Sequence, residues 1–211
     1  MNQDPLLVAD IYGCRSCRLG EIRVVGGFLP TPALPGPRYR SGGLAILCEA
    51  PGSDEERAGQ PLVGSAGKLF TKLVQRAGLN RDDLLLVNRI RCRPPNNRIK
   101  DWPEAVAACD PWTAKELRTY NPAVVVTMGG TAMSAIFGMQ AKVTSTRGTF
   151  AAKDDRHEWG QRVYVASYHP AAAIYGGGAD SEVAQHIVND LKAAKQMIEE
   201  LPYWIMAPRL A

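Results

Sequence analysis

The 211-residue chain contains no apolar run long enough to cross a bilayer, and its first residues lack the apolar core of a signal peptide. The three-glycine pattern of dinucleotide-binding folds is also absent. A phosphate-binding P-loop is excluded because leucine stands at positions 62 and 69, where the motif around Gly67 and Lys68 needs glycine and a hydroxyl residue. We therefore expect a soluble, intracellular (cytoplasmic) protein with no membrane partner, built on neither nucleotide motif.

Aromatic residues are few, at 7%, and only three histidines occur. Hydrophobic residues at 45% and charged residues at 22% are ordinary for globular proteins. Because no linker or internal repeat interrupts the chain, we expect one domain over residues 1–211. The formal charge of +4 permits a polyanionic partner without requiring one, and we expect a monomer.

The stretch from Cys48 to Gly67 organises the chain. It follows an apolar run at 44–47 that predicts a buried strand, and it precedes a helical pattern at 68–76. Its four glycines and two prolines fix an unusual backbone path. In an open α/β sheet, a loop that follows a strand lies at the edge where ligands bind. This loop also holds four acids: Glu49, Asp54, Glu55 and Glu56.

Three further apolar runs predict buried strands, at residues 83–87, 123–128 and 163–166. Periodic segments predict helices at residues 103–120, 131–137 and 181–201. We expect Pro111 to start a second helical piece and Ser181 to cap the last helix. The proline- and glycine-rich segment 26–43 predicts no regular structure, and 140–162 predicts an antiparallel excursion. The strand–helix alternation predicts a parallel sheet covered on both faces.

The loops after these strands bring three kinds of polar side chain to one sheet edge. The first loop supplies the acids, the second begins at Asn88, and the fourth strand leads to His169. Taken singly, Asn88 suits a turn cap and His169 a solvated surface position. Together they predict a site for a planar polar ligand. The second loop also carries four arginines between 89 and 98, a plausible seat for phosphate oxygens.

Five cysteines are present, and four of them suit a metal or cluster site better than disulfides in an intracellular protein. Cys14 and Cys17 form a C-x-x-C pair after a short predicted helix, and Cys92 and Cys109 follow far along the chain. Four thiolates fit tetrahedral zinc or an iron–sulfur cluster. Sixteen residues separate Cys92 from Cys109, which favours a cluster over a zinc ribbon. Cys48 is predicted to be a buried core thiol.

An ordered set of motifs runs from residue 14 to residue 175. Its members are the C-x-x-C pair, Glu49-Ala50-Pro51-Gly52, Gly59-Gln60-Pro61, Val63-Gly64-x-Ala66-Gly67, Asn88, Cys92-Arg93-Pro94-Pro95-Asn96-Asn97-Arg98, Cys109 and His169-Pro170-Ala171. Each is weak alone, and the ordered set is highly specific. On these residues the chain resembles the type 4 uracil-DNA glycosylases, the group of that superfamily with an iron–sulfur cluster.

The resemblance implies a three-layer α/β/α fold around a central four-stranded, mainly parallel sheet. It also implies a DNA glycosylase of base-excision repair, which hydrolyses the N-glycosidic bond of uracil in DNA and releases free uracil. The target base would be flipped out of the stack. A structural [4Fe–4S] cluster would be held by Cys14, Cys17, Cys92 and Cys109.

The same resemblance implies roles in a base pocket. Asn88 would read the Watson–Crick edge of uracil, and His169 would hydrogen-bond O2 and stabilise the departing anion. A donor at the base and a carboxylate near the sugar each meet charge that develops as the bond breaks. Glu49 is the first choice for this carboxylate and Glu55 the second. The backbone of Ala50, Pro51 and Gly52 would contact the base, and Leu62 would cover one face.

The sequence departs from the family pattern in two places. Leu62 replaces an aromatic residue that stacks on uracil, and Cys48 replaces glycine. These departures support an alternative, a cluster-bearing DNA-binding protein with lost or altered excision. A zinc-stabilised nucleotide-binding domain is a third possibility. Ile174 or Tyr175 is the candidate wedge into the duplex. We expect no lyase activity and no covalent trapping on DNA, because the motifs contain no amine nucleophile and no basic insertion.

Overall fold

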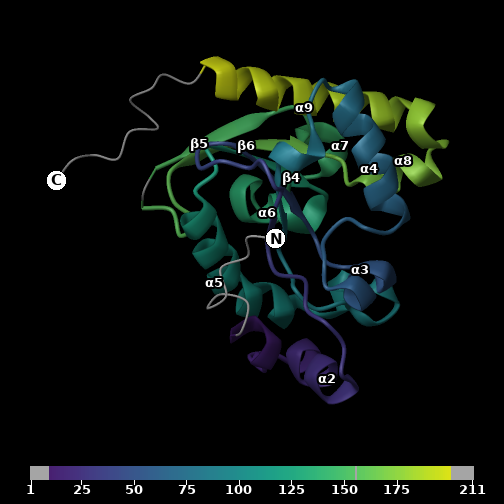
Figure 1. The fold of residues 1–211 in the computed structure, drawn as a ribbon, viewed down its shortest axis with the longest axis vertical. Coiled ribbons are helices and arrows are strands. Elements are labelled where there is room, and N and C mark those ends of the chain that lie inside the picture. The colour runs from purple at the N-terminus through teal and green to yellow at the C-terminus, as the bar shows by residue number, and fades with distance from the viewer. Residues whose placement is uncertain (1–9, 155, 201–211) are drawn as a thin grey trace.

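The computed structural model describes residues 10–154 and 156–200. They form a six-stranded mixed sheet in the order β1-β3-β2-β4-β6-β5, with helices on both sides (Figure 1). The strands are β1 (Leu34–Pro35), β2 (Leu44–Cys48), β3 (Leu85–Asn88), β4 (Val124–Met128), β5 (Phe150–Lys153) and β6 (Arg162–Ser167). The four inner strands run parallel, whereas β1 and β5 pair antiparallel at the two edges.

The prediction of a four-stranded sheet is wrong in strand number, although the four predicted strands form its parallel centre. The strand β1 lies in the segment expected to lack regular structure. It is two residues long and contains Pro35, so its pattern gives no local signal. Its partner is Leu86 of β3, opposite Leu34. The strand β5 lies within the expected antiparallel excursion and pairs with β6.

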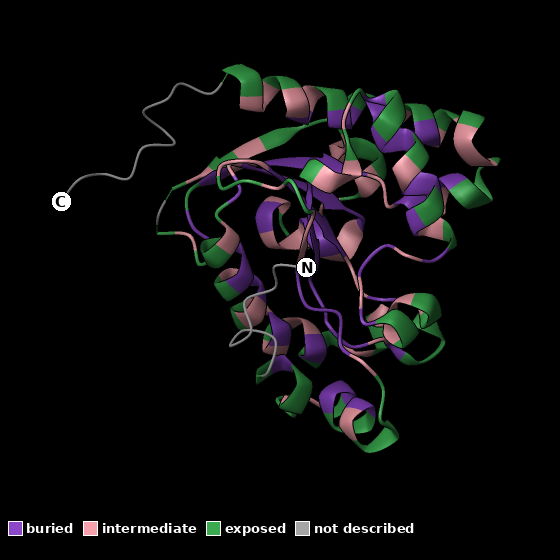
Figure 2. Cartoon of the chain, in the orientation of Figure 1, coloured by how far each residue is buried: buried purple, intermediate pink, exposed green. Residues whose placement is uncertain are grey.

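Both faces of the sheet are covered, which explains the unbroken apolar runs of its central strands. On one face, Leu44 and Ile46 of β2 share a core with helices α4 (Ser65–Arg76), α8 (Pro170–Tyr175) and α9 (Glu182–Glu200). On the other face, Ala45 and Leu47 pack with α5 (Pro103–Tyr120) and α6 (Gly130–Phe137). Figure 2 shows this buried sheet between helices whose outer faces are exposed.

Further helices complete the described fold. They are α2 (Arg18–Gly26), α3 (Ser53–Ala58) and α7 (Val143–Thr146), with short 3₁₀ helices at Arg81–Asp83, Pro95–Asn97, Ile99–Asp101 and Gly178–Asp180. The predicted loop 48–67 therefore contains a helix, α3. It forms because Glu55 Oε2 accepts the Gly52 N–H at 3.1 Å and the first turn is acidic.

One predicted helix break is absent from the structure. The helix α5 continues through Pro111, and the residues on either side of it, Asp110 and Glu116, form ion pairs with Arg89 and Arg91. Ser181 caps α9 as predicted, with its Oγ accepting the Ala184 N–H at 3.1 Å. Of the short helix predicted before the C-x-x-C pair, residues 10–13 are helical. Residues 1–9 and the predicted helix end at 201 lie outside the described residues. None of the described helices has the length and apolar character of a membrane span.

Candidate functional site

A cavity of about 370 Å³ opens where β2, β3 and β6 end. We call it the cleft. It is lined by every residue predicted for catalysis or base binding: Glu49, Ala50, Pro51, Gly52, Glu55, Leu62, Asn88 and His169. The carboxyl ends of parallel strands meet at one edge of a sheet, which is why residues up to 120 positions apart share this cavity. The cleft thus gathers two carboxylates, an amide and an imidazole.

His169 ends the β6 loop and caps α8. Its Nδ1 accepts the Ala171 N–H at 3.2 Å, so in the neutral ring the proton lies on Nε2. Burial lowers the pKa of His169 below its ordinary value, although the charges of Glu49 and Glu55 act in the opposite direction. His169 is therefore a neutral hydrogen-bond donor at neutral pH, with its donor atom on Nε2.

Asn88 is 2% exposed, and Thr31 fixes its orientation. The Thr31 hydroxyl donates to the Arg91 carbonyl at 3.4 Å and accepts from Asn88 Nδ2 at 2.9 Å. This leaves Asn88 Oδ1 as the acceptor available to a ligand in the cleft. Thr31 was not predicted, because it lies in the segment expected to lack regular structure and no local pattern identifies it.

Glu49 follows β2, and its carboxylate rests on the first turn of α6. Its Oε1 accepts the Thr131 N–H at 2.6 Å. Gly129 has a φ of +96°, and a Cβ there would stand 2.7 Å from Glu49 Cδ, so only glycine leaves room for this carboxylate. The N-terminus of α6 carries partial positive charge, which stabilises an ionised carboxylate. The second oxygen is left for other partners in the cleft.

Glu55 is committed to the backbone. Its Oε1 accepts the N–H groups of Val63 and Gly64 at 2.9 and 2.7 Å, and its Oε2 accepts the Gly52 N–H. Both oxygens therefore bind the segment around Leu62 to the Glu49–Gly52 loop. A carboxylate with three amide donors is well suited to holding two loops together.

Leu62 is clamped in a strained conformation. Its φ of +55° lies in the left-handed region, which costs a leucine about 1–2 kcal/mol. Arg81 Nη2 donates to its carbonyl at 2.8 Å from one side, while Glu55 holds the next two residues from the other. The side chain is 6% exposed and belongs to the core beside Cys48, which is 1% exposed as predicted. This loop is a fixed wall of the cleft.

The opposite rim is exposed. Ile174 and Tyr175 of α8 line the cleft and are 38% and 91% exposed. Tyr175 therefore presents an aromatic ring to solvent at the cleft entrance, whereas Ile174 is partly covered.

A second, smaller cavity lies beside α2 and α5. All four predicted ligands, Cys14, Cys17, Cys92 and Cys109, line it. No three or more His, Cys, Asp or Glu side chains within residues 10–154 and 156–200 are grouped tightly enough to hold a metal ion as they stand. The four thiols surround a shared space and do not converge on one point.

Burial dominates the chemistry of these thiols. It raises the pKa of Cys92 to about 12 and also raises the pKa of Cys109. For Cys14, burial acts in the same direction, but hydrogen bonds with Ser16 and Trp112 and the charge of Arg23 outweigh it and lower its pKa. An iron or zinc occupant would deprotonate the thiols and so couple binding to folding.

The prediction that the four arginines of the second loop bind phosphate is wrong for two of them. Arg89 and Arg91 are 5% and 2% exposed and turn inward, because the carboxylates of Asp110 and Glu116 pair with them. Arg93 and Arg98 keep 29% and 59% of their side-chain surface exposed. Only these last two remain available to phosphate.

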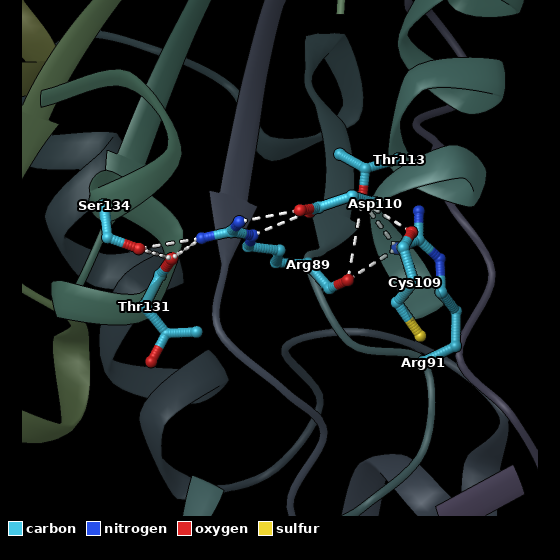
Figure 3. Close-up of polar contacts among 7 residues, drawn as sticks. All are labelled: Arg89, Arg91, Cys109, Asp110, Thr113, Thr131 and Ser134. Atoms are coloured by element: carbon cyan, nitrogen blue, oxygen red, sulfur yellow. Dashed lines mark hydrogen bonds and ion pairs between the residues drawn. The ribbon is translucent and has the colours of Figure 1, made fainter. Parts of the chain in front are cut away.

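Arg89 connects the first turns of α6 to the part of α5 next to Cys109 (Figure 3). It pairs with Asp110 through two bonds of 2.8 and 2.9 Å, next to Cys109. Its Nη1 donates to the Thr131 carbonyl at 2.6 Å and to Ser134 at 2.8 Å, in the helix turn that holds Glu49. The cysteine cavity and the Glu49 carboxylate therefore share one rigid connection.

Comparison with known proteins agrees with this geometry. The sequence profile described as "Uracil DNA glycosylase superfamily" matches residues 40–192, and the chain belongs to this superfamily. Three relatives are each named "Type-4 uracil-DNA glycosylase". The protein from Archaeoglobus fulgidus is 35% identical over 171 residues, covering 80% of this chain and 82% of the relative. That from Saccharolobus solfataricus is 30% identical over 211 residues, covering 96% and 89%. That from Thermotoga maritima is 32% identical over 159 residues, covering 74% and 78%.

Proposed function

We propose that this protein is a monofunctional uracil-DNA glycosylase, which hydrolyses the N-glycosidic bond of uracil in DNA and releases free uracil. The observation that carries the proposal is a neutral imidazole donor and an oriented amide acceptor that line one cavity of about 370 Å³. The similarity to proteins named for this activity supports it.

Uracil has complementary groups for this pair. Asn88 Oδ1 would accept the N3–H of the base, and His169 Nε2–H would donate to O2. As the bond breaks, negative charge develops on O2 and positive charge on the sugar, so the donor binds the transition state more strongly than the substrate. Water then bonds to the sugar carbon and gives its proton to the departing base. Cytosine has no N3–H to donate to Asn88, so it is discriminated against.

Glu49 is the carboxylate we assign to the sugar side. It has one oxygen free of backbone amides, whereas both oxygens of Glu55 are used by them. An ionised Glu49 would stabilise the positive sugar and orient water. Glu55 then serves as a positioning residue for the wall at Leu62.

The target base must leave the DNA stack before it can enter the cleft. Tyr175, at the exposed rim, is our candidate to fill the gap, because a ring replaces the stacking of a flipped base better than Ile174 does. Arg93 and Arg98 would contact phosphates.

We further propose that the cysteine cavity holds a [4Fe–4S] cluster through Cys14, Cys17, Cys92 and Cys109. Four cysteine thiols around one cavity are the ligand set of such a cluster. The cluster would supply four metal–thiolate bonds that join the N-terminal segment to α5, with no part in bond cleavage. Its role is structural.

The test is alkali-induced strand cleavage of a labelled oligonucleotide that contains one uracil, with anaerobically purified protein. We expect cleavage at the uracil, and none at a cytosine in the same position. DNA binding without an abasic product would instead favour the binding module suggested by Leu62 and Cys48. The variant Leu62→Phe, assayed in parallel, reports whether the missing ring limits activity.

A further inference from the structure

Arg23 of α2 is a buried cation that touches a cysteine. The residue is 4% exposed, and its Nε donates to Cys92 Sγ at 3.2 Å. Its remaining contacts are backbone carbonyls: Ile11 at 3.0 Å, Tyr12 at 2.9 Å, Cys14 at 3.3 Å and Phe28 at 3.4 Å. The guanidinium therefore joins the turn that leads into the C-x-x-C pair to the third cysteine, 69 positions away.

The charge of Arg23 has no carboxylate partner in the described part of the chain. Arg89 and Arg91, also buried, pair with Asp110 and Glu116. A buried charge without a counter-charge is costly, because neutral carbonyls compensate only part of its lost hydration. Among the described residues, Cys92 is the only side chain to which Arg23 donates a hydrogen bond, so a thiolate at Cys92 would supply the missing negative charge.

Arg91, at the cysteine cavity, is a second buried arginine that lacks a partner for part of its guanidinium group. It lines the cysteine cavity and is 2% exposed, yet its Nε has no hydrogen-bond partner among the described residues. Figure 3 shows its side chain running beside Cys109. A buried donor without a partner costs about 1–3 kcal/mol, and an anionic sulfur group in the cavity would relieve it.

We propose that Arg23 is a positioning residue for the four-cysteine site, which hydrogen-bonds the Cys92 thiolate and raises the reduction potential of the bound [4Fe–4S] cluster. This rests on the proposed cluster and not on uracil excision. Four thiolates bring four negative charges, and reduction of the cluster adds another. A fixed cation beside one sulfur stabilises the reduced form more than the oxidised form, so its removal lowers the potential.

The alternative is that Arg23 has only a structural role, through packing and hydrogen bonds to backbone carbonyls. Three variants separate this alternative from the proposal. Arg23→Gln removes the charge but keeps an amide donor on a shorter stem. Arg23→Lys keeps the charge but loses the planar fork that reaches five acceptors. The matched control is Arg18→Gln, which removes one positive charge from the same helix. Arg18 is exposed and lies over the Trp102 ring at 5.7 Å.

The experiment uses anaerobically purified full-length protein and records iron per chain, visible absorbance, the reduction potential and the rate of bleaching in air. For Arg23→Gln we expect a more negative potential and about tenfold faster bleaching, because a charge-assisted hydrogen bond is lost. Arg23→Lys should shift the potential less, and Arg18→Gln should leave both readouts unchanged. Equal potentials in Arg23→Gln and Arg18→Gln would overturn the proposal. So would a chain loaded with zinc, which has no redox couple to tune.

A measurement on the unaltered chain keeps the proposal testable if Arg23→Gln does not fold. Resonance Raman spectra in H₂O and D₂O should show a shift in one iron–thiolate stretching band, because Arg23 donates an exchangeable proton to Cys92. Identical spectra would contradict the hydrogen bond. Uracil excision is assayed on the same preparation, so loss of the proposed activity and loss of the proposed tuning are seen separately.

Discussion

The cleft and the cysteine cavity meet at residues 88–92 but are built in different ways. In the cleft, Glu49, Asn88 and His169 each stand within two residues of a strand end, and a hydrogen bond orients each of them, as the Thr131 N–H holds Glu49. In the cysteine cavity, the thiols come from three separate segments, and a buried arginine connects two of them across 69 positions.

This difference indicates that the geometry of the cleft depends on the sheet, whereas that of the cysteine cavity depends on the proposed cluster. Strand ends keep their positions as long as the sheet is folded, so the cleft is pre-organised without a ligand. Within the described residues, Arg23 beside Cys92 has no carboxylate partner, and the Nε of Arg91, which lines the cysteine cavity, has no hydrogen-bond partner. We expect the cleft to keep its side-chain arrangement when residues far from it are mutated. The cysteine cavity should keep its arrangement only when the proposed cluster is bound.

The largest effect should come from His169, which is central to the cleft. Removing a donor that stabilises a developing anion costs about 100- to 1000-fold in rate, so His169→Ala should lose that much in single-turnover excision. Because alanine also removes the α8 cap, we add His169→Asn, which keeps an acceptor for the Ala171 N–H. His169→Ala and His169→Asn should excise uracil at equally reduced rates. The control His186→Ala, on α9 beside Glu182, should excise normally.

If His169→Asn retained full excision, the cleft would not be the reacting site. An intact melting temperature in that variant separates this outcome from a folding defect.

Glu55→Gln should have the next largest effect, because it tests whether a backbone clamp holds the Leu62 wall. An amide nitrogen cannot accept the N–H groups that one carboxylate oxygen now receives. We expect a loss of about 1–3 kcal/mol in the free energy of unfolding and about tenfold or more in excision. Glu56→Gln, which removes one 3.5 Å contact with Arg93, is the matched control. Equal denaturation midpoints for the two variants would argue against the clamp.

The sequence predicted the central strands and the polar set of the cleft because both follow from local patterns. Unbroken apolar runs marked β2, β3, β4 and β6, and the strand-end rule gathered Glu49, Asn88 and His169. The features missed depend on contacts between distant residues. The strand β1 is stabilised by pairing and not by its own pattern, and Arg89 and Arg91 look like surface residues until Asp110 and Glu116 are brought beside them.

Thr31→Val should give a smaller loss, since it removes a residue that acts through Asn88. Valine keeps the shape of threonine but cannot accept from Asn88 Nδ2, so the amide loses its fixed orientation. We expect about tenfold slower excision of uracil, equivalent to about one hydrogen bond, with weaker discrimination against cytosine. Asn88→Ala should reduce the excision rate more than Thr31→Val does. In the combined variant, Thr31→Val should add little, because the two residues act as one unit. Additive losses would contradict this coupling.

The smallest effect should come from pH. The pKa of His169 is lowered by burial, so its folded value lies below the ordinary value of about 6.5. The unfolded chain then binds this proton more readily, and stability falls as pH drops below that ordinary value. Protonation also puts hydrogen on Nδ1, which can no longer accept the Ala171 N–H. We expect the excision rate to fall a few-fold as the pH is lowered from 8 to 5. The rate of His169→Asn should not show this fall, and rate profiles over that pH range test it. A limb that persisted in His169→Asn would assign the titration to another group, and Glu49→Gln would identify whether that group is the carboxylate on the α6 turn.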